Sequence, residues 1–380
     1  MKRKFLMFFL VLSLTFMKVK ALDLTSYSES AILLEPTTKT IIYEVNKDER
    51  RPPASMTKIM TMLLIMENID NGKIGLHDKV TISKNAAGMG GSQVFLQENM
   101  QIEVEQLIKG IAIASGNDAA VAMAEYIAGS TDEFVNMMNK KVSELGLKNT
   151  NFANVHGLDQ ENHYSSAYDM AVIAMELLKH EQILNYTSLY EEYLEKPDGT
   201  KSWLVNTNKL VRFYEGVDGL KTGFTSTAKY CLTATAKKNG IRFLTVVMGV
   251  DTSEHRSADT TSMLNYAFAN YKLNKIIEKG QNITEVKINR GQQDKIIAMA
   301  NEEVYELIKG NDNRNYSYKI NLEEIKAPIS NGEVVGNLEI INNEGNVVKK
   351  IDLVSTQEVK KDNFFSLYKE FFKKILNGFM

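Results

Sequence analysis

The chain has 380 residues, with 45 Lys and Arg against 47 Asp and Glu, and a formal net charge of −2. This balance excludes the strongly basic surface of nucleic-acid-binding proteins, so nucleic acid is not an expected partner. A single cysteine, Cys231, excludes an internal disulfide, and the length predicts two or three domains that rely on apolar cores.

The first 21 residues have the pattern of a secretory signal peptide. Lys2, Arg3 and Lys4 form a basic start, an apolar stretch follows to Met17, and small residues precede a cleavage point after Ala21. The apolar stretch falls short of the ~20 residues that a membrane-spanning helix needs. Cleavage would remove five basic residues and no acidic ones, leaving 40 basic against 47 acidic residues and a formal charge of −7. We therefore predict an exported protein, with an uncleaved anchor as the alternative.

The next part of the chain predicts a hairpin followed by helices. Residues 28–45 form two apolar runs around the turn-like segment EPTTK, which predicts a β-hairpin. Pro52 and Pro53 then open a predicted helix that runs through Met66. Residues 107–178 are helical in pattern and rich in Ala and Met.

Two helix starts in this region carry a capping box, beginning at Ser130 and at Ser166. The first of these helices is predicted to end near Gly146. Strands return in GLKTGF, YCLTATAKK and RFLTVVMGV, with an Asn-Gly turn signal between the last two, and the helix SADTTSMLNYAFANY closes the region at about Tyr271. Because strands lie at both ends of the region, we predict one mixed sheet with a helical insertion.

Residues 275–355 predict a small all-β domain that follows a larger domain at residues 22–272. The segments EVKINR, KIIAMA, YSYKINL and VVGNLEIINNEGNVVKKIDLV alternate as strands do, and Asn343-Glu344-Gly345 marks a turn. This stretch contains no cluster of candidate catalytic residues. We therefore predict a spacer or docking unit.

Residues 362–380 predict an amphipathic helix about 28 Å long. Its polar face excludes spanning a bilayer, so we predict that it lies on the membrane surface; packing against its own protein is the alternative. Three lysines, Lys369, Lys373 and Lys374, lie on the polar face. The apolar face comprises Phe364, Phe365, Leu367, Tyr368, Phe371, Phe372, Ile375, Leu376 and Phe379.

The segment RPPASMTKIM places a hydroxyl and an amine at the start of a helix. Residues three apart share a helix face, so Ser55 Oγ and Lys58 Nζ can come within hydrogen-bond reach. The positive end of the helix dipole favours an alkoxide and an unprotonated lysine, and burial lowers a lysine pKa further. The pair therefore predicts a nucleophilic serine with Lys58 as its base, although an isolated S-x-x-K is a weak signal.

Two further segments strengthen this prediction. Ser115-Gly116-Asn117 places a hydroxyl and an amide on a turn between two helical runs. Lys221-Thr222-Gly223 lies on a predicted strand, whose glycine permits close backbone approach to a ligand. Each has a purely structural alternative, a helix-joining turn and a hairpin end. The three segments in this order, at spacings of about 60 and 106 residues, are hard to attribute to chance.

With these motifs the sequence resembles the penicillin-recognising serine D,D-peptidases, and most closely the low-molecular-weight penicillin-binding proteins that are D-alanyl-D-alanine carboxypeptidases. The matching segments are RRPPASMTKIMT, GSQVFL, IASGNDAAVAMAEYIAGS, NVHGLDQENHYSSAYDMA, VDGLKTGFTSTAKYCLTATA and IKAPISNGEVVG. The resemblance implies an α/β fold in which an antiparallel sheet is flanked by helices and carries a helical insertion, with a second all-β domain and an amphipathic terminal anchor. It also implies action at the outer face of the cytoplasmic membrane or in the cell wall space.

The resemblance implies chemistry on a peptidoglycan stem peptide and inhibition by β-lactams. Ser55 would attack the penultimate D-Ala carbonyl and Lys58 would take its proton. Ser115 would pass a proton to the leaving amine, polarised by Lys221, and Asn117 would hold a substrate amide. The remaining implied roles are an oxyanion hole from the backbone N–H groups of Ser55 and Phe224, and a site for the substrate carboxylate on Thr222 and Arg256. Gly223 is also expected to be a substrate-binding residue, since it permits close backbone approach.

Several readings remain open at this point. Some family members have His where this chain has Phe224, and His156 and Asp159 of the segment HGLD are expected to brace a loop beside the site. A serine β-lactamase is one alternative, and it would need a further Glu to activate the deacylating water. Glu181 matches the E-x-x-L-N pattern of such a residue, but it follows a helical run. We therefore prefer to interpret Glu181 as part of a solvated helix end. A noncatalytic wall-binding scaffold is the third possibility. The five His residues lack zinc-site spacing and no nucleotide-binding loop occurs, so no cofactor or metal is expected.

Overall fold

The structure is a computed structural model that describes residues 22–310, 312, 314–362, 372 and 375. The predicted signal peptide lies outside the described residues, and so does nearly all of the predicted terminal helix. Within the described ranges, no helix is both long enough and apolar enough to cross a membrane.

The larger part of the molecule is built on a five-stranded sheet with the order β2-β1-β9-β8-β7. The predicted N-terminal hairpin is confirmed, and Ala31 of β1 lies opposite Val247 of β9, so both ends of this part share one sheet. All neighbouring strands are antiparallel, so the prediction of a mixed sheet is wrong. Three of the four pairings join consecutive strands in hairpins, which must be antiparallel. The fourth pairs β9 with β1, and the long insertion between them lets β9 run in the opposite direction to β1. The strands are β1 Ser30–Glu35, β2 Thr40–Val45, β7 Val217–Thr225, β8 Lys229–Lys238 and β9 Ile241–Val250.

The turn between β8 and β9 shows why these strands form a hairpin. Asn239 and Gly240 have φ values of 51° and 81°, as the tight two-residue hairpin turn requires. The Asn-Gly signal in the sequence therefore predicted this turn correctly.

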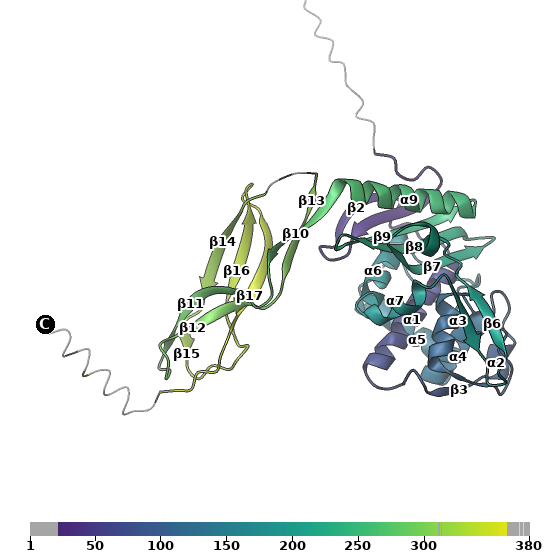
Figure 1. The fold of residues 1–380 in the computed structure, drawn as a ribbon, viewed down its shortest axis with the longest axis horizontal. Coiled ribbons are helices and arrows are strands. Elements are labelled where there is room, and N and C mark those ends of the chain that lie inside the picture. Colours follow the sequence, from purple (N-terminus) through teal and green to yellow (C-terminus); the bar gives the residue numbers. More distant parts are fainter. Residues whose placement is uncertain (1–21, 311, 313, 363–371, 373–374, 376–380) are drawn as a thin grey trace, which may run out of the picture.

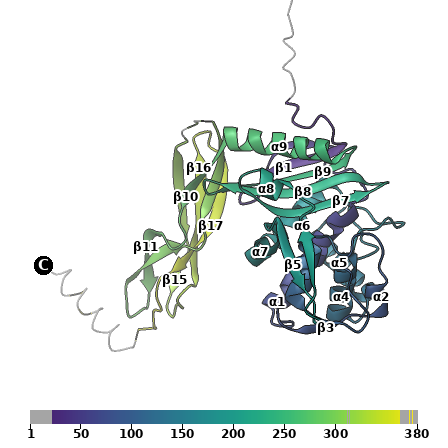
Figure 2. The same ribbon diagram turned by 45° about the vertical axis from the view of Figure 1, so that its right-hand side comes forward.

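Helices cover both faces of the sheet (Figures 1 and 2). Helix α9, Ser253–Asn270, packs on one face over an apolar cluster that includes Leu33, Phe243 and Leu264. It begins four residues earlier than predicted, because the Thr252 side chain caps it by accepting a hydrogen bond from the backbone N–H of His255 at 3.1 Å. The opposite face packs against α1 and α6.

The helical insertion lies between β2 and β7. Ser130 and Ser166 cap α5 and α6 by accepting from the N–H groups of Glu133 and Asp169, which confirms both predicted helix starts. The short antiparallel pairs β3–β4 and β5–β6 were not predicted. The elements are α1 Lys58–Asp70, β3 Lys79–Thr81, α2 Lys84–Ala87, β4 Gln101–Glu103, α3 Val104–Ala112, α4 Asn117–Ala128, α5 Thr131–Glu144, α6 Ala167–Leu177, α7 Leu184–Thr187, β5 Glu191–Glu195, β6 Lys201–Val205 and α8 Leu210–Phe213, with 3-10 turns η1 Ala54–Thr57 and η2 Glu181–Ile183.

The second part of the molecule is all β. Its six-stranded sheet has the order β14-β16-β17-β12-β11-β15, and β10 pairs with β13 in a separate ribbon. Strand β10 starts directly after α9 and leads away from the first sheet (Figure 1). Strands β10, β13 and β15 were not predicted, since none has a long alternating pattern. The strands are β10 Tyr271–Ile277, β11 Asn282–Asn289, β12 Lys295–Ala300, β13 Val304–Lys309, β14 Tyr316–Leu322, β15 Ile325–Lys326, β16 Val334–Asn342 and β17 Val347–Ser355.

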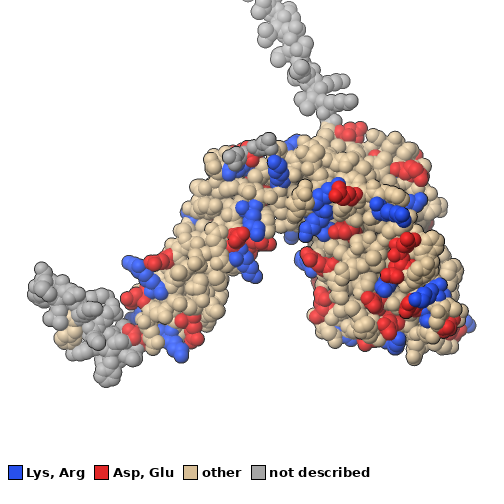
Figure 3. Space-filling view, viewed as in Figure 1, with Lys and Arg blue, Asp and Glu red and all other residues tan. Residues whose placement is uncertain are grey.

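Charges of both signs are interspersed on the face of the molecule seen in Figure 3. Elsewhere as here, exposed charges form pairs in the structure, for example Lys79 with Glu103 at 2.7 Å and Lys295 with Glu285 at 2.8 Å. Exposed pairs of this kind contribute little to stability, about 0 to 1 kcal/mol each. The fold is held mainly by its apolar cores.

Candidate active site

Ser55 lies in a 3-10 turn directly before α1, and not in the α-helix itself. Ala54 begins this turn with a φ of 46°, so the backbone enters it through a left-handed residue. Side chains three residues apart are eclipsed in a 3-10 turn. Ser55 Oγ and Lys58 Nζ consequently lie 3.2 Å apart.

The Lys58 amine is completely buried among oxygen atoms. It donates to Asn117 Oδ1 at 2.6 Å and to the His156 carbonyl at 2.7 Å. Burial, and then the neighbouring charge of Lys221, hold the pKa of Lys58 well below its usual value, although Asp118 opposes the shift. A neutral amine has two hydrogens, which these two acceptors would take, so its lone pair would face Ser55. The arrangement is that of a base next to a nucleophile.

Ser115 lies in the loop between α3 and α4, and its φ of 63° is left-handed. Its hydroxyl is buried and has no hydrogen-bond partner. The loop is held by Asp118, whose carboxylate accepts from the backbone N–H groups of Val94 and Leu96 at 3.1 Å. An unpaired buried hydroxyl is costly, so this one is available for a group that enters the site.

Asn117 does not point into open space. Its Oδ1 accepts from Lys58, its Nδ2 donates to the Gly90 carbonyl at 2.7 Å, and the residue is only 2% exposed. Both ends of the side chain amide are therefore engaged within the protein. In this geometry the residue positions Lys58, and its contact with a substrate amide stays a prediction.

Strand β7 forms the opposite wall of the site. Lys221 is buried and donates to the Thr222 carbonyl at 3.1 Å; burial, with a smaller contribution from Arg256, lowers its pKa to about 7. The Thr222 hydroxyl donates to Thr207 Oγ1 at 2.6 Å. Gly223 lies against the turn of Ser55, where a Cβ atom would stand 2.7 Å from the Pro53 carbonyl oxygen. Only glycine lets β7 approach the turn so closely.

The last two predicted residues lie at the edge of the site. The Phe224 ring is 55% exposed and rests on Tyr230, with 4.4 Å between ring centroids. Arg256 comes from α9, is buried, and has an unpartnered Nε. Its guanidinium faces Tyr230 at 6.0 Å.

These residues surround one cleft of about 590 Å³. Lys58, Asn117 and Lys221 lie outside its lining, buried behind it. The structure therefore brings every predicted site residue to one place, six on the surface of the cleft and three beneath it. The cleft is lined by Ser55, Ser92, Ser115, Thr207, Lys209, Leu210, Phe213, Thr222, Gly223, Phe224, Tyr230, Ser253, Glu254, Arg256 and Ser257.

The segment HGLD, expected to brace a loop beside the site, makes specific contacts that the sequence did not identify. The His156 carbonyl bonds Lys58, and Asp159 Oδ1 accepts from the Thr225 hydroxyl at 2.8 Å, so the segment HGLD contacts both walls of the site. Gly157, with a φ of 91°, packs against the backbone of Ala54. The turn signal in HGLD indicated a loop, but nothing local indicated what the loop touches.

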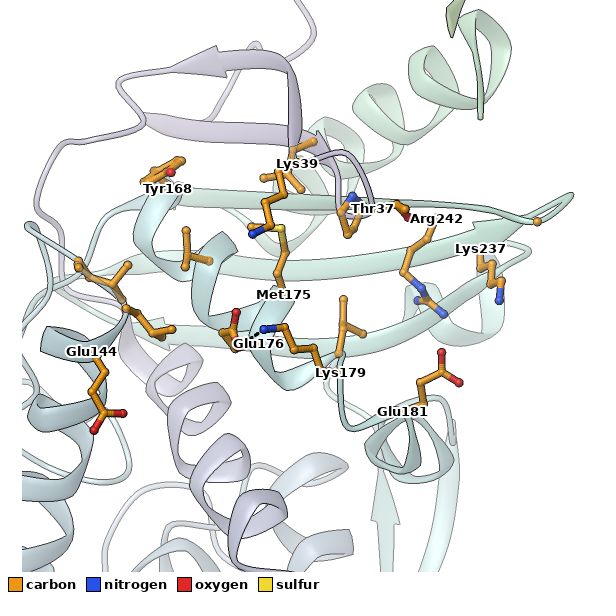
Figure 4. Close-up of a pocket in the computed structure, with 18 residues that line it drawn as sticks. Thr37, Lys39, Glu144, Tyr168, Met175, Glu176, Lys179, Glu181, Lys237 and Arg242 are labelled. Carbon is orange, nitrogen blue, oxygen red and sulfur yellow. Dashed lines mark hydrogen bonds and ion pairs between the residues drawn. The ribbon is translucent and has the colours of Figure 1, made fainter. Parts of the chain in front are cut away.

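Glu181, the residue that could have served a β-lactamase, lies elsewhere. It begins the separate turn η2 and lines a second hollow of about 670 Å³. Figure 4 shows it there with Lys179, Lys237 and Arg242, at the end of β8 and β9 away from Tyr230. None of the three motifs lines this hollow, so Glu181 is not placed to activate a water at Ser55.

The class of protein follows from the way in which β7 closes over the Ser55 turn. Here an antiparallel sheet presents a Lys-Thr-Gly strand to a Ser–Lys pair, and the helical insertion supplies a further hydroxyl, that of Ser115. This is the architecture of the penicillin-recognising serine enzymes.

Comparisons with known proteins identify the family. Residues 17–252 match the D-alanyl-D-alanine carboxypeptidase family, and residues 271–361 match the penicillin-binding protein 5 C-terminal domain. The D-alanyl-D-alanine carboxypeptidase DacF of Bacillus subtilis is 48% identical over 91% of this chain and 90% of its own length. DacA of Escherichia coli is 36% identical over 91% of this chain and 87% of its own length. The chain therefore belongs to the D-alanyl-D-alanine carboxypeptidase family and is a serine hydrolase.

A solved structure agrees with this assignment. Penicillin-binding protein 5 from Haemophilus influenzae superimposes with a TM-score of 0.76 at 33% identity, covering 88% of this chain and 98% of that chain. The penicillin-recognising fold and the second all-β domain are both present. The prediction of the family from three short motifs is confirmed.

Proposed function

We propose that this protein removes the terminal D-Ala from peptidoglycan pentapeptide stems through an acyl-enzyme on Ser55. The observation that carries the proposal is the buried Lys58, whose Nζ lies 3.2 Å from Ser55 Oγ and whose pKa burial holds well below its usual value. The names of its relatives support the same activity, since DacF and DacA are both D-alanyl-D-alanine carboxypeptidases.

In the acylation step Ser55 Oγ attacks the carbonyl carbon of the penultimate D-Ala, and its proton passes to the lone pair of Lys58 Nζ. The carbonyl oxygen becomes an oxyanion that the backbone N–H groups of Ser55 and Phe224 stabilise. The close packing of Gly223 on the Ser55 turn supports this role, and Ser55 and Phe224 both line the cleft.

The intermediate collapses when its C–N bond breaks. Ser115 donates a proton to the leaving amine and is resupplied with the proton held on Lys58, while the charge of Lys221 polarises its hydroxyl. Free D-Ala leaves, and a water then hydrolyses the ester to release the shortened peptide and restore Ser55. The unpartnered hydroxyl of Ser115 supports its role, since no bond within the protein competes for it.

Thr222 and Arg256 would bind the terminal carboxylate of the substrate. Both line the cleft, and the unpartnered Nε of buried Arg256 supports a site for an anion. We assign Asn117 to the positioning of Lys58. β-Lactams would enter as mimics of the same peptide and acylate Ser55.

The domain division and location belong to the same proposal. Residues 22–272 would form the catalytic domain and residues 275–355 the β-rich domain, which would hold it away from an anchor at residues 362–380. An exported protein attached to the outer face of the membrane would then reach the cell wall.

The first experiment separates the proposed activity from its two alternatives. Purified protein should form a stable adduct with a fluorescent penicillin and release D-Ala from a pentapeptide, and Ser55→Ala should abolish both. Ser257→Ala, which removes a hydroxyl that donates to the Ser253 carbonyl within α9 at 2.9 Å, serves as a matched control and should keep both. Fast hydrolysis of the label would indicate a β-lactamase, and a parent protein without any adduct would indicate a scaffold.

A second experiment tests the anchor. Removing residues 362–380 should leave the activity on soluble peptide unchanged and should move the protein from the membrane fraction to the soluble fraction. Retention of the truncated protein in the membrane fraction would contradict the anchor role.

A further inference from the structure

A buried histidine lies behind the Ser55 turn and takes no part in the proposed steps. His163 is only 5% exposed, and its ring lies 5.8 Å from that of Phe152. Both ring nitrogens are engaged. The backbone N–H of Ala153 donates to Nδ1 at 2.9 Å, and Nε2 lies 2.7 Å from the Thr57 hydroxyl.

These partners determine where the imidazole carries its proton. Nδ1 accepts a hydrogen bond, so it has no hydrogen, and burial lowers the pKa of His163 to about 4, which keeps the ring neutral. The single proton must therefore be on Nε2, which donates to Thr57 Oγ1. The hydroxyl of Thr57 then has its own hydrogen free for the carbonyl oxygen of Ala54, at 2.8 Å.

The chain of bonds ends on the peptide unit that contains the nucleophile's N–H. The Ala54 carbonyl and the Ser55 N–H belong to one planar trans peptide, so the two groups point in opposite directions. Holding the carbonyl towards the interior turns the N–H towards the cleft. A hydrogen bond on the carbonyl also polarises the unit and makes its N–H a better donor.

We propose that His163 is a positioning residue for the oxyanion hole, acting through Thr57 to aim the Ser55 N–H at the reacting carbonyl. This inference rests on the proposed function, because the role of the Ser55 N–H belongs to that proposal. His163 touches neither substrate nor nucleophile. Its effect is exerted through the peptide bond that precedes Ser55.

The chain offers a closely matched control. Thr61 lies one turn further along α1, is fully buried like Thr57, and also donates to a backbone carbonyl, that of Val155, at 2.7 Å. Thr57→Val and Thr61→Val each remove one buried hydroxyl and keep the side-chain shape. Only the first change releases the Ala54 carbonyl.

We expect Thr57→Val to lower the rate of penicillin acylation and the kcat for D-Ala release by about 10- to 100-fold, with KM nearly unchanged. Thr57→Ser, which restores a hydroxyl, should recover most of the rate. The acylation rate of Thr61→Val should stay within about threefold of that of the parent, even if its melting temperature falls as far as that of Thr57→Val. His163→Leu leaves the Thr57 hydroxyl without the donor that orients it, so its loss should lie between those of Thr61→Val and Thr57→Val, and His163→Gln, which keeps one N–H donor, should lie closer to the parent.

A double variant shows whether the two residues act as one relay. Adding His163→Leu to Thr57→Val should cause little further loss of acylation, because the bond to Ala54 is already gone. Equal acylation rates in Thr57→Val and Thr61→Val, a change confined to KM, or fully additive losses in the double variant would each overturn the inference. All of these outcomes leave the proposed function intact provided that the parent releases D-Ala and Ser55→Ala does not.

Discussion

Gly157 is the residue whose substitution tests the construction of the nucleophile turn most directly. A Cβ atom at this position would stand 1.9 Å from the Ala54 carbonyl oxygen, 2.4 Å from its carbon and 2.9 Å from the Ser55 nitrogen. All of these are backbone atoms, so no side chain can rotate away. Since such a contact needs at least 3.0 Å, Gly157→Ala must separate the two segments by 1.1 Å, the difference from 1.9 Å.

Gly129→Ala is the control, because it isolates the effect of the left-handed backbone. Gly129 has a φ of 82°, close to the 91° of Gly157, but a Cβ there would have no neighbour within 4 Å. The left-handed conformation alone costs an alanine about 1 to 2 kcal/mol. Gly157→Ala should add about 1 to 3 kcal/mol of overpacking to that loss of unfolding free energy.

The effect on activity should be larger than the effect on stability. A displacement of about 1 Å at a reacting group costs about 10²-fold in rate, so penicillin acylation of Gly157→Ala should fall by that factor while Gly129→Ala stays near the parent. Urea unfolding and stopped-flow acylation at 25 °C measure the two quantities. If Gly157→Ala matched Gly129→Ala in both, the packing of this loop on the Ser55 turn would not control the nucleophile, and the reasoning would be refuted.

Three further predictions concern charge and hydrogen bonding at the site. Asn117→Asp places a carboxylate within 2.6 Å of the Lys58 amine, and this charge favours the ammonium form of Lys58. The acid limb of the pH profile of acylation should therefore move about 1 to 3 pH units upward. An unchanged acid limb would exclude Lys58 as the base. The folded-state pKa of Lys221 is lowered from 10.5 to about 7, so between these values the unfolded chain binds more protons than the folded chain. The unfolding free energy of the parent should therefore rise with pH relative to that of Lys221→Met. Urea titrations that show the same difference between the two proteins at pH 7 and at pH 10 would contradict this. Thr222→Val removes a hydroxyl from the proposed carboxylate site and should lower kcat/KM for the pentapeptide by about 10- to 100-fold. This loss corresponds to about 1.5 to 3 kcal/mol, the value for a hydrogen bond to a charged group. A loss below threefold would show that Thr222 does not bind the carboxylate.

The sequence was sufficient wherever a structure depends on neighbouring residues. The helix starts at Ser130 and Ser166 were predictable because a capping side chain bonds a backbone N–H three residues away. The turn at Asn239 and Gly240 was predictable because these residues tolerate positive φ. Ser55 and Lys58 were predictable as a pair because three residues separate them on a helical turn.

The strand pairings and the environment of the site depended on contacts that no local pattern encodes. Ser130 and Ser166 predict helix starts, but no local sequence pattern predicts that β1 pairs with β9 or that all neighbouring strands of the sheet are antiparallel. Strands as short as β15, with two residues, have no pattern to detect.

The residues that tune the nucleophile were decided by tertiary packing alone. The bonds of the Asn117 amide to Lys58 and Gly90 were not predicted, because a side chain's partners depend on what the fold places beside it. The sequence by itself identified the groups to which we assign the chemistry, since their spacing and type are local properties. Their burial, the low pKa of Lys58 and the tight contact of Gly157 arise only when loops that are distant in the chain exclude water from one another.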